Sequence, residues 1–246
     1  MKIELKKEYK IDYSYLDKNL KLKINECFNL AQNTATEYFK KFNGDNISVR
    51  KNNNAVWVVT KSKIHIYNNP LWLDTIIGES YTSMVKPIRV ETETKFIDKN
   101  NQLVFIASQQ SCPLDMDTRK IRKIETATFP KDMEIDNSLF ENDYQRLTDI
   151  FDESNFVYEQ KVYSQDIDYS NHVNNTIYTR YIMNALSNEF LDNINIKDME
   201  MHYIAEGKEG QILKIYKKEL NNNTIRFLIK ESDREIIRAS ISFESK

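Results

Sequence analysis

The chain repeats one order of secondary-structure patterns in its two halves. The segment that begins at Tyr9 (YKIDYSYLDKNLKLKINECFNLAQ) aligns without a gap with the segment that begins at Gln160 (QKVYSQDIDYSNHVNNTIYTRYIM). Few residues are identical, but the pattern of elements coincides and Asp17 falls on Asp168. Such a repeat indicates an internal duplication, and therefore two similar folded units.

Hydrophobic spacing predicts a long helix early in each half. Apolar residues recur at three- and four-residue steps over residues 24–42 and again over about residues 175–191. Residues 44–54 are polar and predict a loop, and the asparagines at 221–223 predict a hairpin. Segments rich in β-branched and aromatic residues predict strands at 5–15, 55–67, 74–88, 89–97 and 103–114, and then at 156–163, 199–205, 210–220, 224–231 and 235–243.

Each half therefore combines one long helix with an antiparallel sheet, which is an α+β arrangement. A helix of this length, followed by strands that curve around it, is the hotdog arrangement. We expect a double hotdog, with two tandem units that each pack a long helix on a curved antiparallel sheet. The expected boundaries are 1–125 for the first unit and 155–246 for the second. Residues 126–154 are mostly polar, contain Pro130 and predict a linker.

Composition and short motifs exclude several classes of function. A formal net charge of −2 shows no basic excess, so we expect no nucleic-acid partner. The four glycines fit no dinucleotide-binding or phosphate-loop pattern, and no GxSxG nucleophile motif occurs. Cys27 and Cys112 lie far apart, which predicts core thiols rather than a disulfide. No apolar stretch reaches membrane-spanning length and no targeting pattern occurs, so we expect a cytoplasmic protein without a membrane span.

Residues 166–175, DIDYSNHVNN, concentrate carboxylates, a histidine, a serine and several amides directly before the second predicted helix. A helix N-terminus carries unpaired N–H groups and a partial positive charge, which suit a developing oxyanion. The two halves differ at this point, because the first has Lys21 and Lys23 where the second has His172 and Asn174. We therefore predict that the chemistry resides in the second unit alone.

Several stretches resemble the acyl-acyl carrier protein (acyl-ACP) thioesterases of plastids and bacteria, which are double hotdogs. In the first half, residues 57–61 (WVVTK) are similar to the family's Trp-Val-Leu-Thr-Arg, residues 70–74 (PLWLD) to its Pro-x-Trp-Gly-Asp turn, and residues 114–124 to its basic segment. In the second half, residues 168–175 match Asp-x-Asn-x-His-Val-Asn-Asn, and residues 203–206 fall on a downstream element that begins with tyrosine and ends with glutamate. The chain departs from the pattern at Ser170, where the motif has asparagine, and at Tyr181, where tryptophan is usual.

The resemblance implies an enzyme that hydrolyses fatty acyl-ACP to a free fatty acid and the carrier protein, using an activated water. No cofactor or metal is expected, since no paired-histidine spacing such as HExxH occurs. His172 is a candidate base because histidine ordinarily titrates near neutral pH, and Glu206 is a second candidate base. The predicted catalytic residues are Asp168, His172, Glu206, Ser170 and Asn174.

Other interpretations of these residues remain open. A single histidine is often structural, Asp168 and Asn174 can serve as loop and helix-cap residues, and Glu206 can be a solvated loop carboxylate. His65 and His202 alternate with apolar neighbours in strands and are expected to be structural.

The resemblance also implies that the first unit binds the acyl chain, with Phe28, Ala31, Ala35 and Trp57 as its predicted lining. The expected partner is an acyl carrier protein, which is acidic in this family. The basic residues Arg119, Lys120, Arg122 and Lys123 are its candidate docking surface. A homodimer is possible. Two further readings remain: a hotdog thioesterase acting on acyl-coenzyme A, and a non-catalytic acyl-binding double hotdog.

Overall fold

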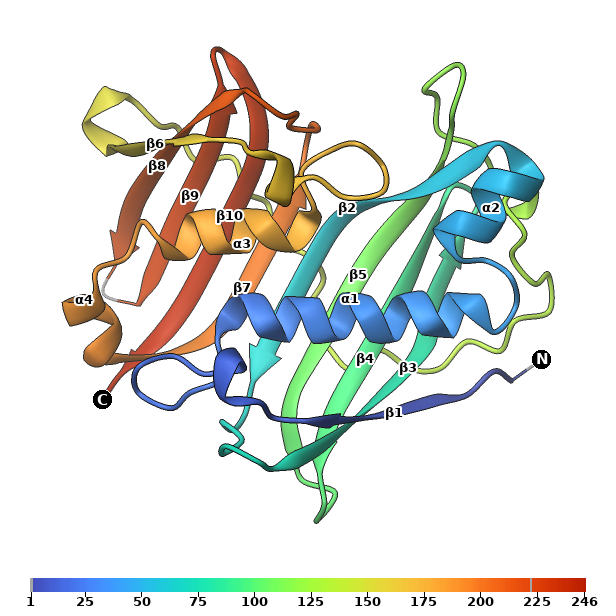
Figure 1. The fold of residues 1–246 in the computed structure, drawn as a ribbon, viewed down its shortest axis with the longest axis horizontal. Helices are drawn as coiled ribbons and strands as arrows, with labels where there is room; N and C mark the ends of the chain where they lie inside the picture. The colour runs from blue at the N-terminus through green and yellow to red at the C-terminus, as the bar shows by residue number, and fades with distance from the viewer. Residues whose placement is uncertain (1, 222) are drawn as a thin grey trace. The chain divides into compact units, whose positions relative to one another are not determined.

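The structure, a computed structural model, describes residues 2–221 and 223–246 and separates into two compact units between Asp143 and Tyr144. Each unit is an antiparallel sheet with helical structure on one face (Figure 1). The division falls within the segment predicted as a linker. The assignment of acyl binding to the first unit and catalysis to the second stays a prediction.

The first unit contains a sheet in the order β1-β3-β4-β5-β2, with every neighbouring pair antiparallel. Its strands are β1 (Leu5–Lys10), β2 (Ala55–Ile66), β3 (Thr75–Lys86), β4 (Arg89–Asp98) and β5 (Leu103–Asp115). Helix α1 (Ile24–Lys40) packs on β1, β3, β4 and β5. Its buried face carries Ile24, Cys27, Phe28, Leu30, Ala31, Thr34, Ala35, Tyr38 and Phe39, which follow the three- and four-residue spacing of the sequence.

The predicted loop at residues 44–54 is wrong, because Asn46–Asn53 form helix α2. Asp45 caps this helix by accepting the N–H of Ser48 (3.1 Å), and Val49 is buried beneath it. Only one turn of the helix contributes an apolar side chain to the core. The helix therefore depends on its cap rather than on a periodic apolar face, which is the signal that the sequence lacked.

The second unit contains a sheet in the order β7-β10-β9-β8-β6, again antiparallel throughout. Its strands are β6 (Phe156–Lys161), β7 (Ile194–Tyr203), β8 (Ile212–Asn221), β9 (Thr224–Glu231) and β10 (Arg234–Ser245). Asn221 pairs with Thr224 at the predicted hairpin; Asn222 lies outside the described residues.

The long second helix predicted over residues 175–191 is wrong in its extent. Helix α3 ends at Met183 (Asn175–Met183), and a separate short helix α4 spans Asn188–Asp192. Ser187 starts α4, because its hydroxyl accepts the N–H of Phe190 (3.1 Å). Ala185 and Leu186 stay buried between the two helices. Apolar periodicity therefore continues across the break and conceals it.

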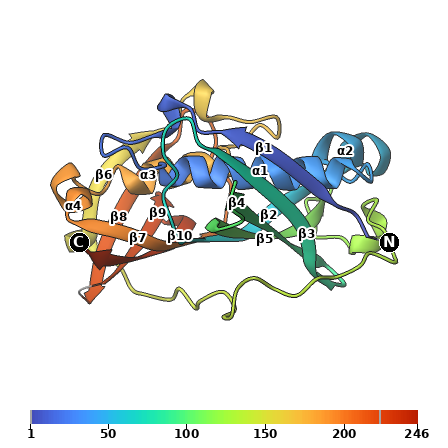
Figure 2. The same ribbon diagram turned by 90° about the horizontal axis from the view of Figure 1, so that it is seen from below.

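The polar segment that precedes the division packs on the first sheet. Glu93, buried in β4, accepts the N–H of Leu139 (2.5 Å) and the hydroxyl of Ser138 (2.7 Å). Figure 2 shows this segment on the face of the sheet opposite α1. Burial raises the pKa of Glu93 above the ordinary value for glutamate. Hydrogen bonds to a buried carboxylate thus hold a segment that has little apolar periodicity.

The segment that follows the division is held by the second unit in a similar way. Leu147 is buried, and the N–H of Gln145 donates to Glu200 Oε1 (2.8 Å). Arg238 donates to the carbonyl of Asp149 (2.7 Å). Each half of the predicted linker is therefore ordered by the unit to which it is attached.

The two units repeat the geometry of the polar loop in detail. In the second unit the N–H of Asp168 donates to the carbonyl of His172 (2.9 Å), and in the first the N–H of Asp17 donates to the carbonyl of Lys21 (2.8 Å). Each loop is closed by an isolated bridge, Ile167 with Val173 in one unit and Leu16 with Leu22 in the other. Within this loop the alignment of the two halves therefore holds residue by residue, and the side chains differ.

Candidate active site

The loop of residues 166–175 is anchored by Asp166, which is buried at its start. Its carboxylate accepts the N–H of Tyr163 (2.9 Å) and pairs with Arg180 of α3 (2.6 Å). Its carbonyl accepts the N–H of Asn174 (2.9 Å). A buried carboxylate with a charged partner and backbone donors is satisfied, so it fixes both ends of the loop against α3.

Asn174 forms the N-cap of α3. Its Oδ1 accepts the N–H and the hydroxyl of Thr176, each at 3.0 Å. The predicted start of a helix directly after the polar cluster is therefore confirmed. The Oδ1 atom is engaged in capping, and a catalytic role for the Asn174 amide stays a prediction.

His172 and Glu206 come together from separate parts of the second unit. His172 Nε2 lies 3.0 Å from Glu206 Oε2, and the two side chains are 18 % and 38 % exposed. His172 belongs to the loop before α3, whereas Glu206 follows β7. A histidine that is paired with a carboxylate and still open to solvent can accept and return a proton, because the carboxylate holds the ring in a fixed orientation.

Gly207 joins the segment that carries Glu206 to α3. The N–H of Val173 donates to the carbonyl of Gly207 (3.0 Å), and the N–H of Gly207 donates to the hydroxyl of Tyr178 (2.8 Å). A Cβ added at Gly207 would lie 2.6 Å from Tyr178 Oη and 3.2 Å from a methyl group of Val173. Only glycine allows this close approach. Because Glu206 precedes Gly207 and His172 precedes Val173, the approach brings Glu206 beside His172.

Tyr178 was not among the residues predicted for the site. It is buried in α3, and burial raises the pKa of its hydroxyl. In the sequence it belongs to the apolar stripe of the helix, so its spacing predicts a core residue. Only the approach of Gly207 shows that its hydroxyl holds the Glu206 segment in place.

Replacing Tyr178 with phenylalanine should leave the buried N–H of Gly207 without its acceptor. We expect a loss of about 1–3 kcal/mol in the free energy of unfolding, and a lower kcat with little change in KM. Tyr158→Phe is the matched control, because Tyr158 donates to the carbonyl of Tyr181 (2.6 Å) elsewhere on α3. Thermal unfolding and steady-state kinetics of both variants test this. Equal kcat values in the two variants would contradict a positioning role for Tyr178.

Asp168 is half-buried and organises the loop through its backbone and its carboxylate. Its N–H donates to the carbonyl of His172 (2.9 Å), and its Oδ1 accepts the N–H of Ser170 (2.8 Å). Burial raises the pKa of Asp168, and the charge of Glu206 adds to the rise, while the Ser170 N–H and His172 oppose it. The charged form of Asp168 is thus disfavoured by its surroundings.

This pKa shift predicts a pH-dependent gain in stability for Asp168→Asn. A carboxyl group whose pKa is raised in the folded state loses stability as the pH rises from its ordinary pKa through the raised value. Asparagine stays neutral and keeps an oxygen for the N–H of Ser170. We expect the variant to be more stable than the native protein near pH 7, with the difference shrinking toward about pH 4. Unfolding midpoints measured across this range test it; a difference that does not vary with pH would contradict it.

Ser170 lies in the same loop and is half-buried, with its backbone bonded to Asp168 as described above. The equivalent residue of the first unit is Asn19, whose N–H donates to Asp17 Oδ1 at the same distance (2.8 Å). The loop therefore accepts either serine or asparagine without a change in its backbone. A catalytic role for the Ser170 hydroxyl stays a prediction.

The residues predicted to bind the acyl chain lie at different points of the first unit. Phe28, Ala31 and Ala35 are buried on α1. Trp57 packs edge-on against Phe39, near the end of that helix, and its indole N–H donates to the carbonyl of Gly44 (2.8 Å). The structure thus places Trp57 in an aromatic cluster with Phe39. At 1.5 Å per residue, Phe39 lies about 16 Å along α1 from Phe28. Their role as a common lining stays a prediction.

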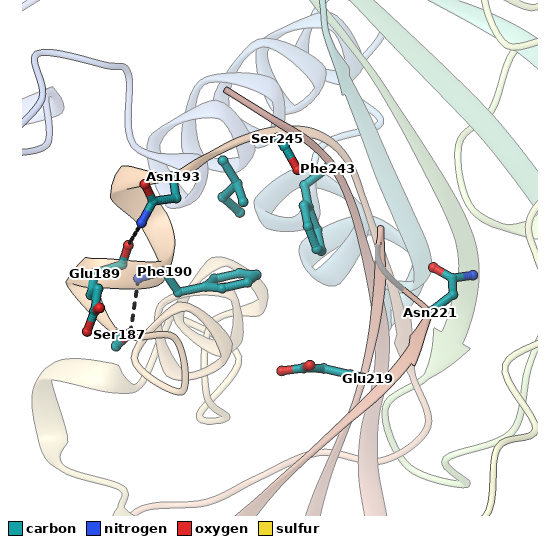
Figure 3. Close-up of a pocket in the computed structure, with 9 residues that line it drawn as sticks. Ser187, Glu189, Phe190, Asn193, Glu219, Asn221, Phe243 and Ser245 are labelled. Atoms are coloured by element: carbon teal, nitrogen blue, oxygen red, sulfur yellow. Dashed lines mark hydrogen bonds between the residues drawn. The ribbon is translucent and has the colours of Figure 1, made fainter.

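A pocket of about 570 Å³ occurs in the second unit, around α4 and the ends of β7, β8 and β10. Figure 3 shows the rings of Phe190 and Phe243 pointing toward each other inside it, and Glu219 of β8 also lines it. None of the predicted catalytic or acyl-binding residues lines this pocket. It lies beyond the C-terminal end of α3, whereas His172 precedes the N-terminal end.

The basic segment differs from the expectation at one residue. Arg122 is half-buried and donates to the carbonyls of Asn53 (2.7 Å) and Thr126 (3.4 Å), so its guanidinium is held within the first unit. Arg119, Lys120 and Lys123 are exposed. A docking surface for the carrier protein at this segment would therefore rest on these three side chains, and it stays a prediction.

Family models match both halves of the chain. The acyl-ACP thioesterase N-terminal domain matches residues 2–129, and the acyl-ACP thioesterase C-terminal domain matches residues 151–245. The chain belongs to the acyl-ACP thioesterase family. This confirms the family predicted from the sequence, and with it an enzyme that hydrolyses the thioester of fatty acyl-ACP. No curated protein matches the chain significantly by sequence.

Solved structures of similar proteins support the same fold. An acyl-ACP thioesterase from Bacteroides thetaiotaomicron is 19 % identical, with a TM-score of 0.89 over 98 % of both chains. A putative oleoyl thioesterase from Lactobacillus plantarum is 19 % identical, with a TM-score of 0.87 over 98 % of this chain and 96 % of that one. The 12:0-ACP thioesterase from Umbellularia californica is 17 % identical, with a TM-score of 0.86 over 99 % and 98 %. The predicted α+β double hotdog is confirmed.

Two properties of the described residues bear on other expectations. Among residues 2–221 and 223–246, no cluster of three or more histidine, cysteine, aspartate or glutamate side chains is placed to hold a metal ion. Within the same residues, no helix has the length and apolar character needed to cross a membrane.

Proposed function

We propose that this acyl-ACP thioesterase carries out hydrolysis at the His172–Glu206 pair, with Asp168 shaping the loop that presents His172. A water oxygen attacks the carbonyl carbon of the thioester, and the pair takes up the proton that the water loses. When the carbon–sulfur bond breaks, the departing sulfur receives a proton from the pair. The products are a free fatty acid and the carrier protein thiol.

The 3.0 Å contact between His172 Nε2 and Glu206 Oε2 carries this proposal. His172 lies in the loop before α3 and Glu206 in the turn after β7, and the backbone of each recurs in the first unit. There, Lys21 stands in place of His172 and Asn69 in place of Glu206. A lysine and an amide cannot form the same proton-exchanging pair at neutral pH, which supports one reactive unit for each chain.

The finer features of the activity belong to the same proposal. We place the reaction in fatty acid biosynthesis in the cytoplasm, with acyl carrier protein as the partner and the acyl chain held by the first unit. Cys27 and Cys112 are both buried and free, as expected in a reducing compartment. The possible homodimer remains part of the proposal and is testable by sedimentation equilibrium.

Turnover of a panel of acyl-ACP thioesters tests the proposed function. The purified protein should release free fatty acid and carrier thiol in equal amounts, with a specificity constant higher than for the same chain on coenzyme A. Varying chain length and saturation in the panel identifies the preferred acyl group. A higher constant on coenzyme A would establish the alternative substrate. Bound acyl chains without turnover would establish a non-catalytic binding protein.

A further inference from the structure

An exposed apolar tip extends from the first unit, formed by two neighbouring loops. We define it by five large side chains that are between 51 % and 68 % exposed: Tyr13, Leu20, Leu71, Trp72 and Leu73. The ring of Tyr13 packs edge-on against Trp72, with centroids 5.9 Å apart, and this contact joins the two loops. Three consecutive residues of the second loop are each more than half exposed, so its turn projects from the fold.

The same turn occurs in the second unit with polar side chains. In the first unit the N–H of Leu71 donates to Asp74 Oδ2 (2.8 Å), and in the second the N–H of Lys208 donates to Gln211 Oε1 (2.7 Å). The N–H of Leu73 donates to the carbonyl of Ile11, directly after β1, and the N–H of Gly210 donates to that of Val162, directly after β6, each at 3.0 Å. The residues of the second unit equivalent to the tip are Ser164, Asn171, Lys208, Glu209 and Gly210. The backbone therefore forms without any apolar side chain at these positions.

Two leucines of the tip occupy backbone conformations that disfavour leucine. Leu20 has φ 59° and Leu73 has φ 70°. Their counterparts are Asn171 (φ 64°) and Gly210 (φ 83°), residue types that adopt this region readily. The tip thus places strained leucines in solvent where the other unit has unstrained polar residues. Strain and apolar exposure combined at one place point to a binding function.

Lysines lie in the first loop of the tip, and the ammonium of Lys23 donates to the carbonyl of Ser14 (2.8 Å). The first loop carries Lys18, Lys21 and Lys23, whose counterparts in the second unit are Tyr169, His172 and Asn174. Asp12 is an exposed acid of the same loop. Asp17 accepts the N–H groups of Asn19 and Lys21, and Asp74 accepts that of Leu71, so these two carboxylates face the backbone of their own loops. Relative to the second unit, these two loops therefore gain apolar side chains at the tip and lysines in the first loop.

We propose that the apolar tip docks the protein on the surface of an anionic lipid bilayer. Tryptophan and tyrosine favour the interface between headgroups and acyl chains, leucine inserts below it, and lysines attract anionic headgroups. A projecting turn fits a deformable bilayer. The inference goes beyond thioester hydrolysis and does not depend on the proposed catalytic residues.

Sedimentation with vesicles tests the proposal directly. We expect the native protein to sediment with vesicles of phosphatidylcholine and phosphatidylglycerol, less at high salt, and to show a blue shift of tryptophan fluorescence. Replacing the turn by its counterpart from the second unit (Leu71→Lys, Trp72→Glu, Leu73→Gly) should reduce the bound fraction at least about tenfold. Ile47→Glu is the matched control, because Ile47 is an exposed apolar residue of α2 outside the tip, and it should bind as the native protein does.

Three further measurements distinguish the other possible occupants of the tip. The triple variant should unfold at the same temperature or higher, since Leu73→Gly removes strain, and it should hydrolyse soluble acyl-ACP with an unchanged KM. Absence of vesicle binding by the native protein would overturn the proposal. If the native protein does not bind vesicles and the triple variant has a raised KM for acyl-ACP, the proposal is also overturned, and the tip is assigned to binding of the carrier protein. If the native protein does not bind vesicles and forms a dimer that the triple substitution dissociates, the tip is assigned to self-association.

Discussion

Replacing His172 with alanine should lower the turnover of acyl-ACP at least about a hundredfold while the protein stays folded. General acid–base assistance by a positioned side chain typically contributes about 10²–10⁴ in rate, and His172 is the ring within reach of Glu206. Its side chain is partly exposed and the carbonyl that bonds Asp168 belongs to the backbone, so truncation leaves the loop intact. Steady-state kinetics, with circular dichroism to verify the fold, provide the measurement.

Glu206→Ala should have a similar effect, and the two substitutions should not be additive. The two side chains share one contact, so removing either one leaves the other without its partner. The double variant should therefore be only slightly slower than either single variant. Full activity in both single variants would contradict the assignment of the site.

The first unit supplies the controls for both substitutions. Lys21→Ala and Asn69→Ala alter the residues equivalent to His172 and Glu206, on loops of the same backbone geometry. We expect turnover of soluble acyl-ACP to stay within about twofold of the native value for these variants, in keeping with the small effects of most surface substitutions. A loss as large as that of His172→Ala would show that both units take part in the chemistry.

Gly207→Ala should produce the second large effect, by displacing Glu206. The new methyl group would lie 2.6 Å from Tyr178 Oη, inside the normal contact distance, so the segment or the tyrosine must move. Overpacking of this kind costs about 1–3 kcal/mol in stability. A displacement of about 1 Å at a reacting group can lower the rate about a hundredfold. Thermal unfolding and kcat measured on the same preparation test both effects.

A second substitution identifies the cause of that loss. Tyr178→Phe removes the hydroxyl that the new methyl group would meet. The double variant Gly207→Ala with Tyr178→Phe should therefore lose less stability than the sum of the two single losses. Strictly additive losses would mean that Gly207→Ala acts through some other contact, such as that with Val173.

Elements with a clear hydrophobic period could be predicted closely. Helix α1 and strands β2 to β5 lie where the spacing indicated, because each buries a regular apolar face. Helix α2 was missed because it depends on the Asp45 cap, and the break between α3 and α4 was missed because Ser187 interrupts the helix without interrupting the apolar pattern. Caps act through single hydrogen bonds, which periodicity does not report.

The sequence by itself determined the duplication, the family and the polar loop that holds Asp168 and His172. These features depend on residue types and on short spacings along the chain, which are visible before folding. The same comparison of halves shows that one unit has Lys21 where the other has His172.

Only the tertiary structure decided which distant groups meet at that loop. It places Glu206 3.0 Å from His172, and it shows that Gly207 and the buried hydroxyl of Tyr178 maintain this approach. It also shows that two exposed leucines of the apolar tip, Leu20 and Leu73, have strained backbones. These properties arise from contacts between segments that are far apart in the chain and from backbone angles. Neither the contacts between distant segments nor the backbone angles can be predicted from local spacing along the sequence.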